Sequence, residues 1–284
     1  MITVLESIKL SADYLTGKGI ESPRMNAELL LADIIGCKRL ELYLSFDKPL
    51  SEVELQKYRE FIKRRGNFEP LQYILGKVEF YGLEFIVNPS VLIPRPETEL
   101  LVENILNQIS KEKEQWILDI GCGSGNISIA IAASLTNVNL VATDIDENSL
   151  LVAKENAEKH GATKKIKFMS HDILKDDFDN FPMFDFIVSN PPYVSEENYL
   201  TLQKEIIEFE PRIAVTDDND GYKFFRIIAE KASTKLKING KLFFEIAQGQ
   251  SEQVKQILNE NRFSNINVIK DYQNIDRIIY GEMK

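Results

Sequence analysis

The segment NPPY, Asn190 to Tyr193, follows an apolar run that is typical of a buried strand, and it offers hydrogen-bond acceptors with few backbone donors. Because proline lacks a backbone N–H and has a fixed φ angle, the Asn190 side-chain oxygen and the Pro191 carbonyl would form a rigid pair of acceptors. Such a pair could hold both N–H bonds of a planar nitrogen and favour a less delocalised, more amine-like lone pair. Tyr193 would stack on the flat group and screen it from water. We therefore predict Asn190, Pro191, Pro192 and Tyr193 as catalytic residues; a plain turn after a strand is the structural alternative.

A glycine-rich loop, LDIGCGSGN, joins another strand-like run to a helix. Gly121, Gly123 and Gly125 have no Cβ, so the chain can turn tightly and a ligand can touch its backbone. The helix start behind them offers unpaired N–H groups and a partial positive charge. The G-x-G-x-G spacing differs from the dinucleotide fingerprint, and no lysine follows as in a P-loop, which disfavours ATP and GTP. A loop that only packs a strand against a helix is the structural alternative.

Carboxylates end successive predicted strands at Asp119, Asp144 and Asp172. Asp144 follows the glycine loop by about 20 residues, where an α/β nucleotide site places the acid that binds ribose hydroxyls. A helix N-cap is the alternative role, but Asp146 or Asn148 can fill it. The set suits a ligand with hydroxyl, amine and purine groups and without phosphates. The predicted cofactor contacts are Asp119, Gly121, Cys122, Gly123, Ser124, Gly125, Asp144, Asp172, Ile173 and Asn190.

The composition is that of a folded globular protein, since 44% of the 284 residues are apolar and 27% are charged. We see no signal peptide and no apolar run long enough to cross a bilayer, so we expect no membrane partner. The two cysteines, Cys37 and Cys122, fall in different predicted domains, which fits a reducing cytoplasm rather than a disulfide framework. His160 and His171 have no zinc-like spacing, so we expect no metal.

The net charge of −10 falls entirely on residues 76–284, because residues 1–75 carry equal numbers of acidic and basic side chains. Proteins that grip long nucleic acids normally present a basic face. Here the one dense basic stretch, KYREFIKRR at residues 57–65, is typical of a solvated helix face. We therefore expect no direct nucleic-acid partner.

The predicted elements divide the chain into three parts. Residues 1–75 read as helices, with Ser22 and Pro23 at one helix start and a Ser51–Glu54 capping box at another. Residues 76–95 contain a strand-like pattern around Gly82 that predicts a β-hairpin linker. Residues 96–284 alternate strands and helices, which predicts an α/β domain with a mostly parallel sheet. The last two strands have no helix between them, so the final one must run antiparallel to its neighbour.

Three of these motifs, LDIGCGSG, TDID and NPPY, together resemble the S-adenosylmethionine (SAM)-dependent methyltransferases that modify planar nitrogens. The segments LIPRPETE, SPRMNAELLLA and FEP narrow the resemblance, over essentially the whole chain, to the release-factor glutamine methyltransferases of the PrmC/HemK type. The resemblance implies a class I, Rossmann-like fold with a seven-stranded sheet, an N-terminal helical domain that docks the substrate, and SAM converted to S-adenosylhomocysteine. It also implies methylation of the glutamine amide in the GGQ motif of peptide-chain release factors.

Two other functions remain open. One is a methyltransferase that acts on DNA or RNA bases, because exocyclic base amines pose the same chemical problem and share NPPY. The other is a SAM-binding regulatory protein without turnover, which the intact NPPY segment disfavours. The roles of Arg95, Glu97 and Glu245 are also left open by the sequence.

Overall fold

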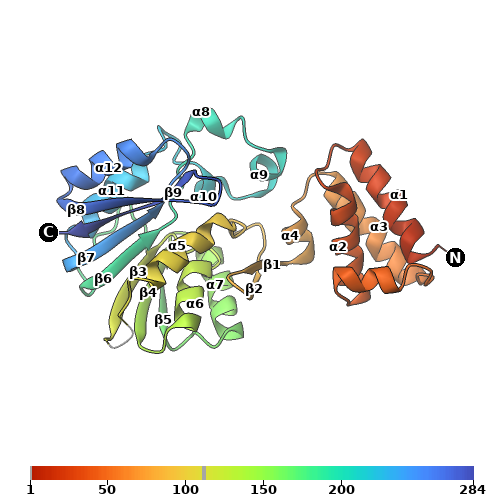
Figure 1. The fold of residues 1–284 in the computed structure, drawn as a ribbon, viewed down its shortest axis with the longest axis horizontal. Coiled ribbons are helices and arrows are strands. Elements are labelled where there is room, and N and C mark those ends of the chain that lie inside the picture. The colour runs from red at the N-terminus through yellow and green to blue at the C-terminus, as the bar shows by residue number, and fades with distance from the viewer. Residues whose placement is uncertain (1, 111–112) are drawn as a thin grey trace. The chain divides into compact units, whose positions relative to one another are not determined.

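The computed structural model describes residues 2–110 and 113–284. These residues form two compact units (Figure 1). The helical unit contains the described residues up to Lys77 together with Gln203–Phe209. The α/β unit contains the described residues of Val78–Leu202 and Glu210–Lys284. Within residues 2–110 and 113–284, no helix combines the length and the apolar character needed to cross a membrane.

The two helix starts predicted for the helical unit differ in the structure. The predicted capping box opens α3 (Glu52–Gly66): the Ser51 hydroxyl accepts from the Glu54 backbone N–H, and the Glu54 carboxylate accepts from the Ser51 N–H at 2.7 Å. Ser22 precedes α2 (Pro23–Ile35), but its side chain makes no capping hydrogen bond. The other elements are α1 (Val4–Gly17), η1 (Arg39–Leu44), α4 (Leu71–Leu75) and α9 (Lys204–Phe209).

One buried arginine, Arg65, connects α9 to helices that lie much earlier in the sequence. Arg65 is only 4% exposed. Its guanidinium donates to the Asn26 side-chain oxygen at 2.8 Å, to the Glu69 carbonyl at 3.0 Å and to the Glu205 carboxylate on α9. Since a buried guanidinium is costly unless it is paired, these contacts explain why Gln203–Phe209 folds with the helical unit.

The predicted hairpin forms from β1 (Lys77–Phe80) and β2 (Leu83–Ile86). Its turn residues Tyr81 and Gly82 both have positive φ angles, 51° and 72°, as a type I′ turn requires. Asn156 fastens the second strand to the α/β unit. Its side chain accepts from the Ile86 N–H at 2.7 Å and donates to the Ile86 and Ser124 carbonyls, both at 3.0 Å.

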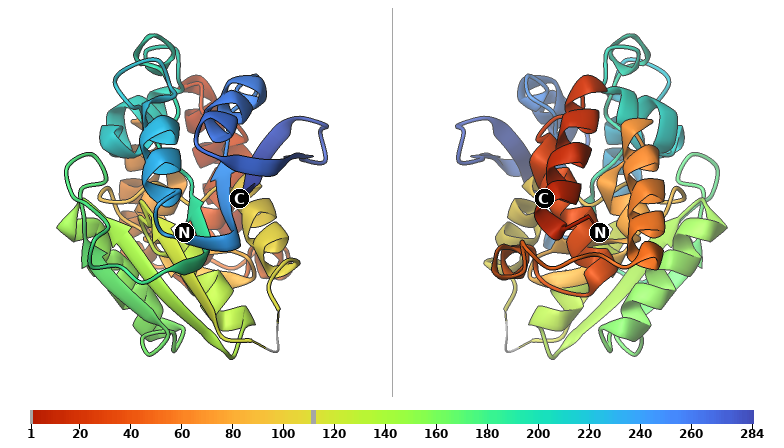
Figure 2. Two further views of the ribbon diagram at one scale, coloured as in Figure 1. Left: turned by 90° about the vertical axis from the view of Figure 1, so that its left-hand side faces the viewer. Right: turned by 90° about the vertical axis from the view of Figure 1, so that its right-hand side faces the viewer.

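Seven strands among the described residues form the central sheet of the α/β unit, in the order β5-β4-β3-β6-β7-β9-β8. The strands are β3 (Gln115–Ile120), β4 (Val138–Asp144), β5 (Ile166–Ser170), β6 (Phe184–Ser189), β7 (Leu236–Glu245), β8 (Phe263–Lys270) and β9 (Asp276–Met283). The pairs from β5 to β7 are parallel, and β9 runs antiparallel to both β7 and β8. The predicted α/β fold with an antiparallel last strand is therefore confirmed. The C-terminal strands, dark blue in Figure 2, lie at one edge of the sheet.

Alternating residues of the strands pack against helices on opposite faces, as the two-residue period of a strand dictates. Ile117 belongs to the cluster with α5 (Glu97–Leu106), α6 (Asn126–Ser134) and α7 (Glu147–Lys159). Its neighbour Leu118 belongs to the cluster with α11 (Lys223–Ala232) and α12 (Ser251–Glu260). The short helices α8 (Glu196–Tyr199) and α10 (Arg212–Val215) follow β6.

We expect Asn156→Ala to lower the free energy of unfolding by about 3 kcal/mol, because it removes three hydrogen bonds of a fully buried residue and leaves backbone groups of β2 and the glycine loop without partners. The measurement is urea denaturation followed by circular dichroism. Glu155→Ala, at an exposed position of the same helix, is the control and should change stability by much less. Equal stability of the two variants would show that Asn156 does not fasten the hairpin.

Candidate active site

A cavity of about 300 Å³ lies at the carboxyl edge of the parallel strands, within the α/β unit. The register of the sheet brings the glycine loop and NPPY together, because Ile120 pairs with Thr143 on one side of β3 and with Ser189 on the other. The Ser189 hydroxyl also donates to the Ile120 carbonyl at 2.8 Å. The glycine loop and NPPY begin one residue later. Gly121 and Asn190 therefore leave neighbouring strands at the same level.

The wall of this cavity contains many, but not all, of the residues predicted from the sequence. Its lining includes Gly121, Gly123, Asp144, Asp172, Ile173, Asn190, Pro191 and Pro192. The lining does not include Asp119, Cys122, Ser124, Gly125 or Tyr193. The side chains of Asp119, Cys122 and Ser124 are almost completely buried. The predicted roles of all these residues in binding and catalysis stay predictions.

The glycine loop is held by the end of β4. The N–H groups of Gly121 and Cys122 both donate to the Thr143 carbonyl, at 2.8 and 2.9 Å. Gly123 has a φ of 53° with open space where a Cβ would stand, so it presents bare backbone to the cavity. A Cβ at Gly125 would instead come within 3.0 Å of Ile129. Gly125 therefore serves the packing of the loop against its helix.

Asp144 is part of the same wall. Its two carboxylate oxygens accept the N–H groups of Gly123, at 2.8 Å, and of Asp146, at 3.0 Å. Burial raises the pKa of Asp144, and these two hydrogen bonds oppose the rise. Asp146 caps α7 by accepting from the Asn148 N–H. Asp144 is thus free of the capping role, and each of its oxygens keeps a lone pair for a ligand.

Asp119 is completely buried rather than exposed to the cavity. One of its oxygens accepts from the Ser128 hydroxyl at 2.6 Å, and the other has no partner among the described residues. Burial raises the pKa of Asp119 to about 7. A buried carboxylate with an unused oxygen carries an unmet demand for a donor, and a cationic donor would meet it best.

The third strand end contributes Asp172 and Ile173, as predicted, and also His171. Asp172 accepts from the Leu174 N–H at 2.9 Å. Burial lowers the pKa of His171, so its ring is neutral near pH 7. This side of the cavity therefore offers an acidic group beside an uncharged, largely apolar surface.

The two ends of the NPPY segment face different surroundings. Asn190 lines the cavity, and its side-chain nitrogen donates to the Thr98 hydroxyl at 3.3 Å. The Tyr193 hydroxyl donates to the buried carboxylate of Glu245 at 3.2 Å. Burial and the nearby charge of Glu245 raise the pKa of Tyr193, so its phenol stays neutral.

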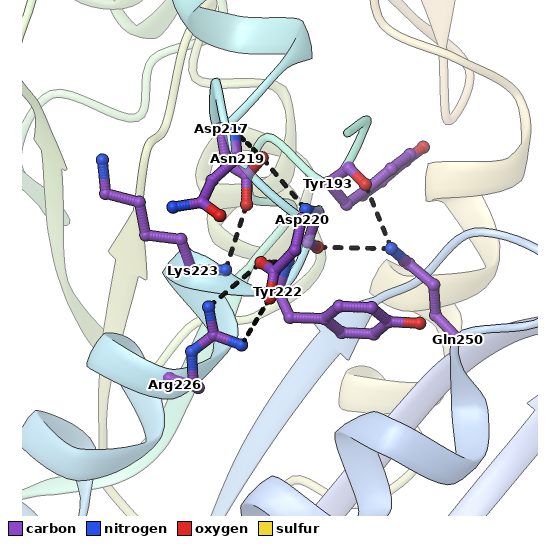
Figure 3. Close-up of polar contacts among 9 residues, drawn as sticks. Tyr193, Asp217, Asn219, Asp220, Tyr222, Lys223, Arg226 and Gln250 are labelled. Atoms are coloured by element: carbon purple, nitrogen blue, oxygen red, sulfur yellow. Dashed lines mark hydrogen bonds and ion pairs between the residues drawn. The ribbon is translucent and has the colours of Figure 1, made fainter. Parts of the chain in front are cut away.

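Gln250 joins the backbone of Tyr193 to a turn of acidic and glycine residues (Figure 3). The Gln250 side-chain nitrogen donates to the carbonyls of Tyr193, at 3.0 Å, and Gly221, at 3.2 Å. Asp217 shapes the turn by accepting backbone N–H groups from Asn219, Gly221 and Lys223. Gly221 has a φ of 84°, and a Cβ there would lie 2.7 Å from the Tyr193 carbonyl oxygen. Only glycine fits between this turn and NPPY.

Comparison with known proteins agrees with this arrangement. Residues 6–76 match the PrmC N-terminal domain and residues 96–216 the methyltransferase small domain. The release factor glutamine methyltransferase of Chlorobaculum tepidum is 37% identical over 97% of this chain and 95% of its own length. That of Bacillus subtilis is 38% identical over 98% and 97%. The chain belongs to the release factor glutamine methyltransferase family.

Among solved structures, the hMettl16 catalytic domain in complex with a 3′UTR hairpin is similar in fold, with a TM-score of 0.59 and 18% identity over 84% of this chain and 94% of that one.

The structure joins two of the signatures that link the chain to this methyltransferase family. Arg95 of PRPETE donates to the carboxylate of Glu210 in FEP, and Glu210, which is 6% exposed, also accepts from the Ile93 N–H. The segments on both sides of this ion pair, at Leu92 and Pro211, line the cavity. Arg95, whose role the sequence left open, therefore joins two segments that line the cavity.

One side of the cavity is lined by residues that the sequence did not predict. The missed lining residues include Ser90, Val91, Ile145, Ile213, Thr216, Asp217, Lys223 and Phe224. The cluster DDNDG at residues 217–221 carried a usable signal, because such runs form turns in which aspartate accepts nearby backbone N–H groups. The apolar members carried none, since their exposure to a cavity depends on tertiary packing.

We expect Gly221→Ala to lower the catalytic rate of this methyltransferase roughly tenfold or more, because the new methyl group would push the Tyr193 carbonyl and shift NPPY. Gly249→Ala is the matched control. Gly249 has a similar φ, 87°, but open space around its Cβ position, so its variant carries the backbone strain without the clash. Methyl transfer from labelled SAM measures both. Equal losses in the two variants would contradict a specific effect on NPPY.

Proposed function

We propose that this protein transfers the methyl group of SAM to the side-chain amide nitrogen of a glutamine in peptide-chain release factors, in their GGQ motif. One observation carries the proposal: the acceptors of NPPY and the glycine loop with Asp144 line the same cavity. The names of relatives that match nearly the full chain support the substrate. Such a substrate would be met in the cytoplasm.

The residues of the cavity fit SAM, which carries positive charge on its sulfonium and ammonium groups. Asp144 retains lone pairs for the ribose hydroxyls, and Ile145 and Ile173 supply apolar surface for the purine. The unpartnered oxygen of Asp119, which is buried and does not line the cavity, has the right charge for an ammonium group. The glycine loop, Asp172 and the neighbouring backbone complete the proposed cofactor contacts.

The chain's own contribution to the chemistry is position and polarity. Bound SAM would supply an activated methyl group, which passes to the amide nitrogen as its C–S bond breaks and leaves S-adenosylhomocysteine. Asn190 and the Pro191 carbonyl would accept the two N–H bonds and aim the lone pair, an orientation effect worth roughly 7–11 kcal/mol in favourable intramolecular cases. The nitrogen becomes strongly acidic as it gains the methyl group, so water can take its proton and no catalytic base is needed.

The alternative of a nucleic-acid base methyltransferase has weaker support. The similarity to the hMettl16 domain concerns the fold, at 18% identity. The α/β unit carries the acidic excess of the chain, whereas a protein that grips nucleic acid normally presents a basic face. Methyl transfer to purified release factor and to DNA and RNA, assayed side by side, separates the two functions. Tight SAM binding without transfer to any of them would instead favour a regulatory protein.

We expect Asn190→Ala to lower the rate of methyl transfer roughly 100-fold or more while the Kd for SAM changes less than threefold, because Asn190 acts on the substrate amide. Asp144→Ala should instead raise the Kd for SAM at least tenfold, since it removes the proposed ribose acceptor. Calorimetry and single-turnover transfer give the two quantities. Parallel losses of affinity and rate in both variants would contradict this division of roles.

We further propose that the helical unit docks the release factor. Its element η1 exposes Leu40 and Leu44 at 71% and 89%. Exposed apolar side chains that gather on one element are typical of an interaction surface. The match of residues 6–76 to the PrmC N-terminal domain supports a role specific to this family.

We expect the double variant Leu40→Glu with Leu44→Glu to lower kcat/KM for intact release factor roughly 100-fold or more, because each leucine would lose burial worth about 1.5–3 kcal/mol. The rate on a short peptide containing the glutamine should stay the same. Ile238→Glu is the control: this residue is 79% exposed near the amino end of β7 and receives the same change. An unchanged kcat/KM for release factor would argue against docking through η1.

A further inference from the structure

We propose that Thr98 and Glu245 are positioning residues that fix which way the side-chain amide of Asn190 faces. The inference rests on the proposed function, in which the Asn190 oxygen accepts an N–H bond of the substrate. An asparagine side chain is nearly symmetric in shape, and a half-turn about its last bond would present a donor where the reaction needs an acceptor. Some interaction must therefore distinguish the two orientations.

The contacts around Asn190 form a chain that ends in a buried acid. Thr98, in the first turn of α5, and Glu245, at the end of β7, are both 2% exposed. The Thr98 hydroxyl donates to one Glu245 oxygen at 2.6 Å, and the Tyr193 hydroxyl donates to the other at 3.2 Å. The Asn190 nitrogen donates to the Thr98 oxygen at 3.3 Å.

Proton counting gives this chain a direction. A hydroxyl has one proton, and a carboxylate has only acceptors. Because Glu245 takes the Thr98 proton, the Thr98 oxygen can only accept from Asn190. The group of Asn190 beside Thr98 must then be the NH₂, and the side-chain oxygen must be the atom left for the cavity. Within the described residues no donor bonds to that oxygen, and Asn190 lines the cavity.

This direction also bears on which substrates are accepted. An oxygen in the cavity accepts from the amide of glutamine, whereas it repels the carboxylate of glutamate. Reversing Asn190 would place an NH₂ opposite the substrate NH₂, and two donors cannot bond to each other. A site built around a specific hydrogen bond loses much of its rate when the pair is mismatched. Thr98 and Glu245 therefore act on rate and specificity without touching the substrate.

A merely structural role for Thr98 and Glu245 is the competing explanation, and double variants distinguish the two. Thr98→Val removes the hydroxyl at constant volume, so the Asn190 amide no longer prefers one of its two orientations. We expect kcat to fall a few-fold. Glu245→Met removes the acceptor, so the Thr98 hydroxyl donates to the Asn190 oxygen instead. This hydrogen bond stabilises the reversed amide, which presents its NH₂ group to the cavity. We expect that variant to lose roughly 10- to 100-fold in kcat. The double variant has no Thr98 hydroxyl to stabilise the reversed amide, so its kcat should recover to the level of Thr98→Val alone.

The assays are run on the full chain at about pH 8, because burial raises the pKa of Glu245 and an alkaline pH favours its carboxylate form. Thr98→Ser keeps the hydroxyl and should retain most of the activity. The Kd for SAM and the Tm should change little across the series. If the double variant is no more active than Glu245→Met, or if both single variants keep the wild-type kcat, the proposal is wrong.

A second measurement needs no substrate. The side-chain NH₂ resonances of Asn190 in ¹⁵N-labelled protein, assigned by their loss in Asn190→Asp, should shift in Thr98→Val and Glu245→Met but not in Thr98→Ser. Unshifted resonances in Glu245→Met would overturn the proposal even if no methylation were detected. Failure of the wild-type protein to methylate release factor would instead overturn the proposed function, so the two failures remain distinguishable.

Discussion

The parallel register of β3 and β6 is the constraint on which the rest of the site depends. It sets Ile120 opposite Ser189, and the Ser189 hydroxyl closes onto the Ile120 carbonyl. The glycine loop and NPPY are about 70 residues apart in sequence, yet the chain leaves the sheet at the same level in both. A shift of one residue would turn every side chain of β6 to the other face and separate the two segments. The proposed proximity of the cofactor and the substrate amide thus depends first on the hydrogen-bonding register of β3 and β6.

The segment that follows NPPY links the cavity wall to the helical unit through the chain itself. Val194 and Thr216 form a bridge at its base, and α9 between them pairs with Arg65 of the helical unit. The segment returns at Glu210, whose carboxylate holds Arg95. The cavity wall is therefore connected to the proposed docking unit on both sides of α9.

Buried acids give the site its electrostatic character. Burial raises the pKa values of Asp119, Asp144 and Glu245 because it disfavours the charged form of each. Hydrogen bonds oppose the rise in pKa of each acid. They come from a serine hydroxyl for Asp119, from two backbone N–H groups for Asp144, and from the hydroxyls of Thr98 and Tyr193 for Glu245. Only Asp119 keeps an oxygen without a partner among the described residues. Asp119 would suit a cationic group, Asp144 would suit the ribose hydroxyls of the proposed cofactor, and Glu245 serves the proposed orientation of Asn190.

Much of the fold could be predicted because its signals are local. The Ser51–Glu54 box, the alternation of strands and helices, and the glycine spacing each depend on a few neighbouring residues. The insertion of β9 between β7 and β8 could not be predicted, since strand order is a property of the whole sheet. The helices α8, α9 and α10 were also missed, because short helices held by distant partners such as Arg65 have weak local patterns.

Residue types alone specify which chemical groups stand at the strand ends: the acids, the flexible glycines, and an asparagine beside two prolines that lack backbone donors. The chemistry that these groups permit follows directly from their covalent structure. The direction in which each group faces depends instead on how the core packs. Asp119 and Asp144 are both strand-end acids, yet one is buried against Ser128 and the other lines the cavity. Likewise, the direction of Tyr193 and the partner of Asn190 come from Glu245 and Thr98, residues far away in the chain whose side chains reach them only when the core has packed.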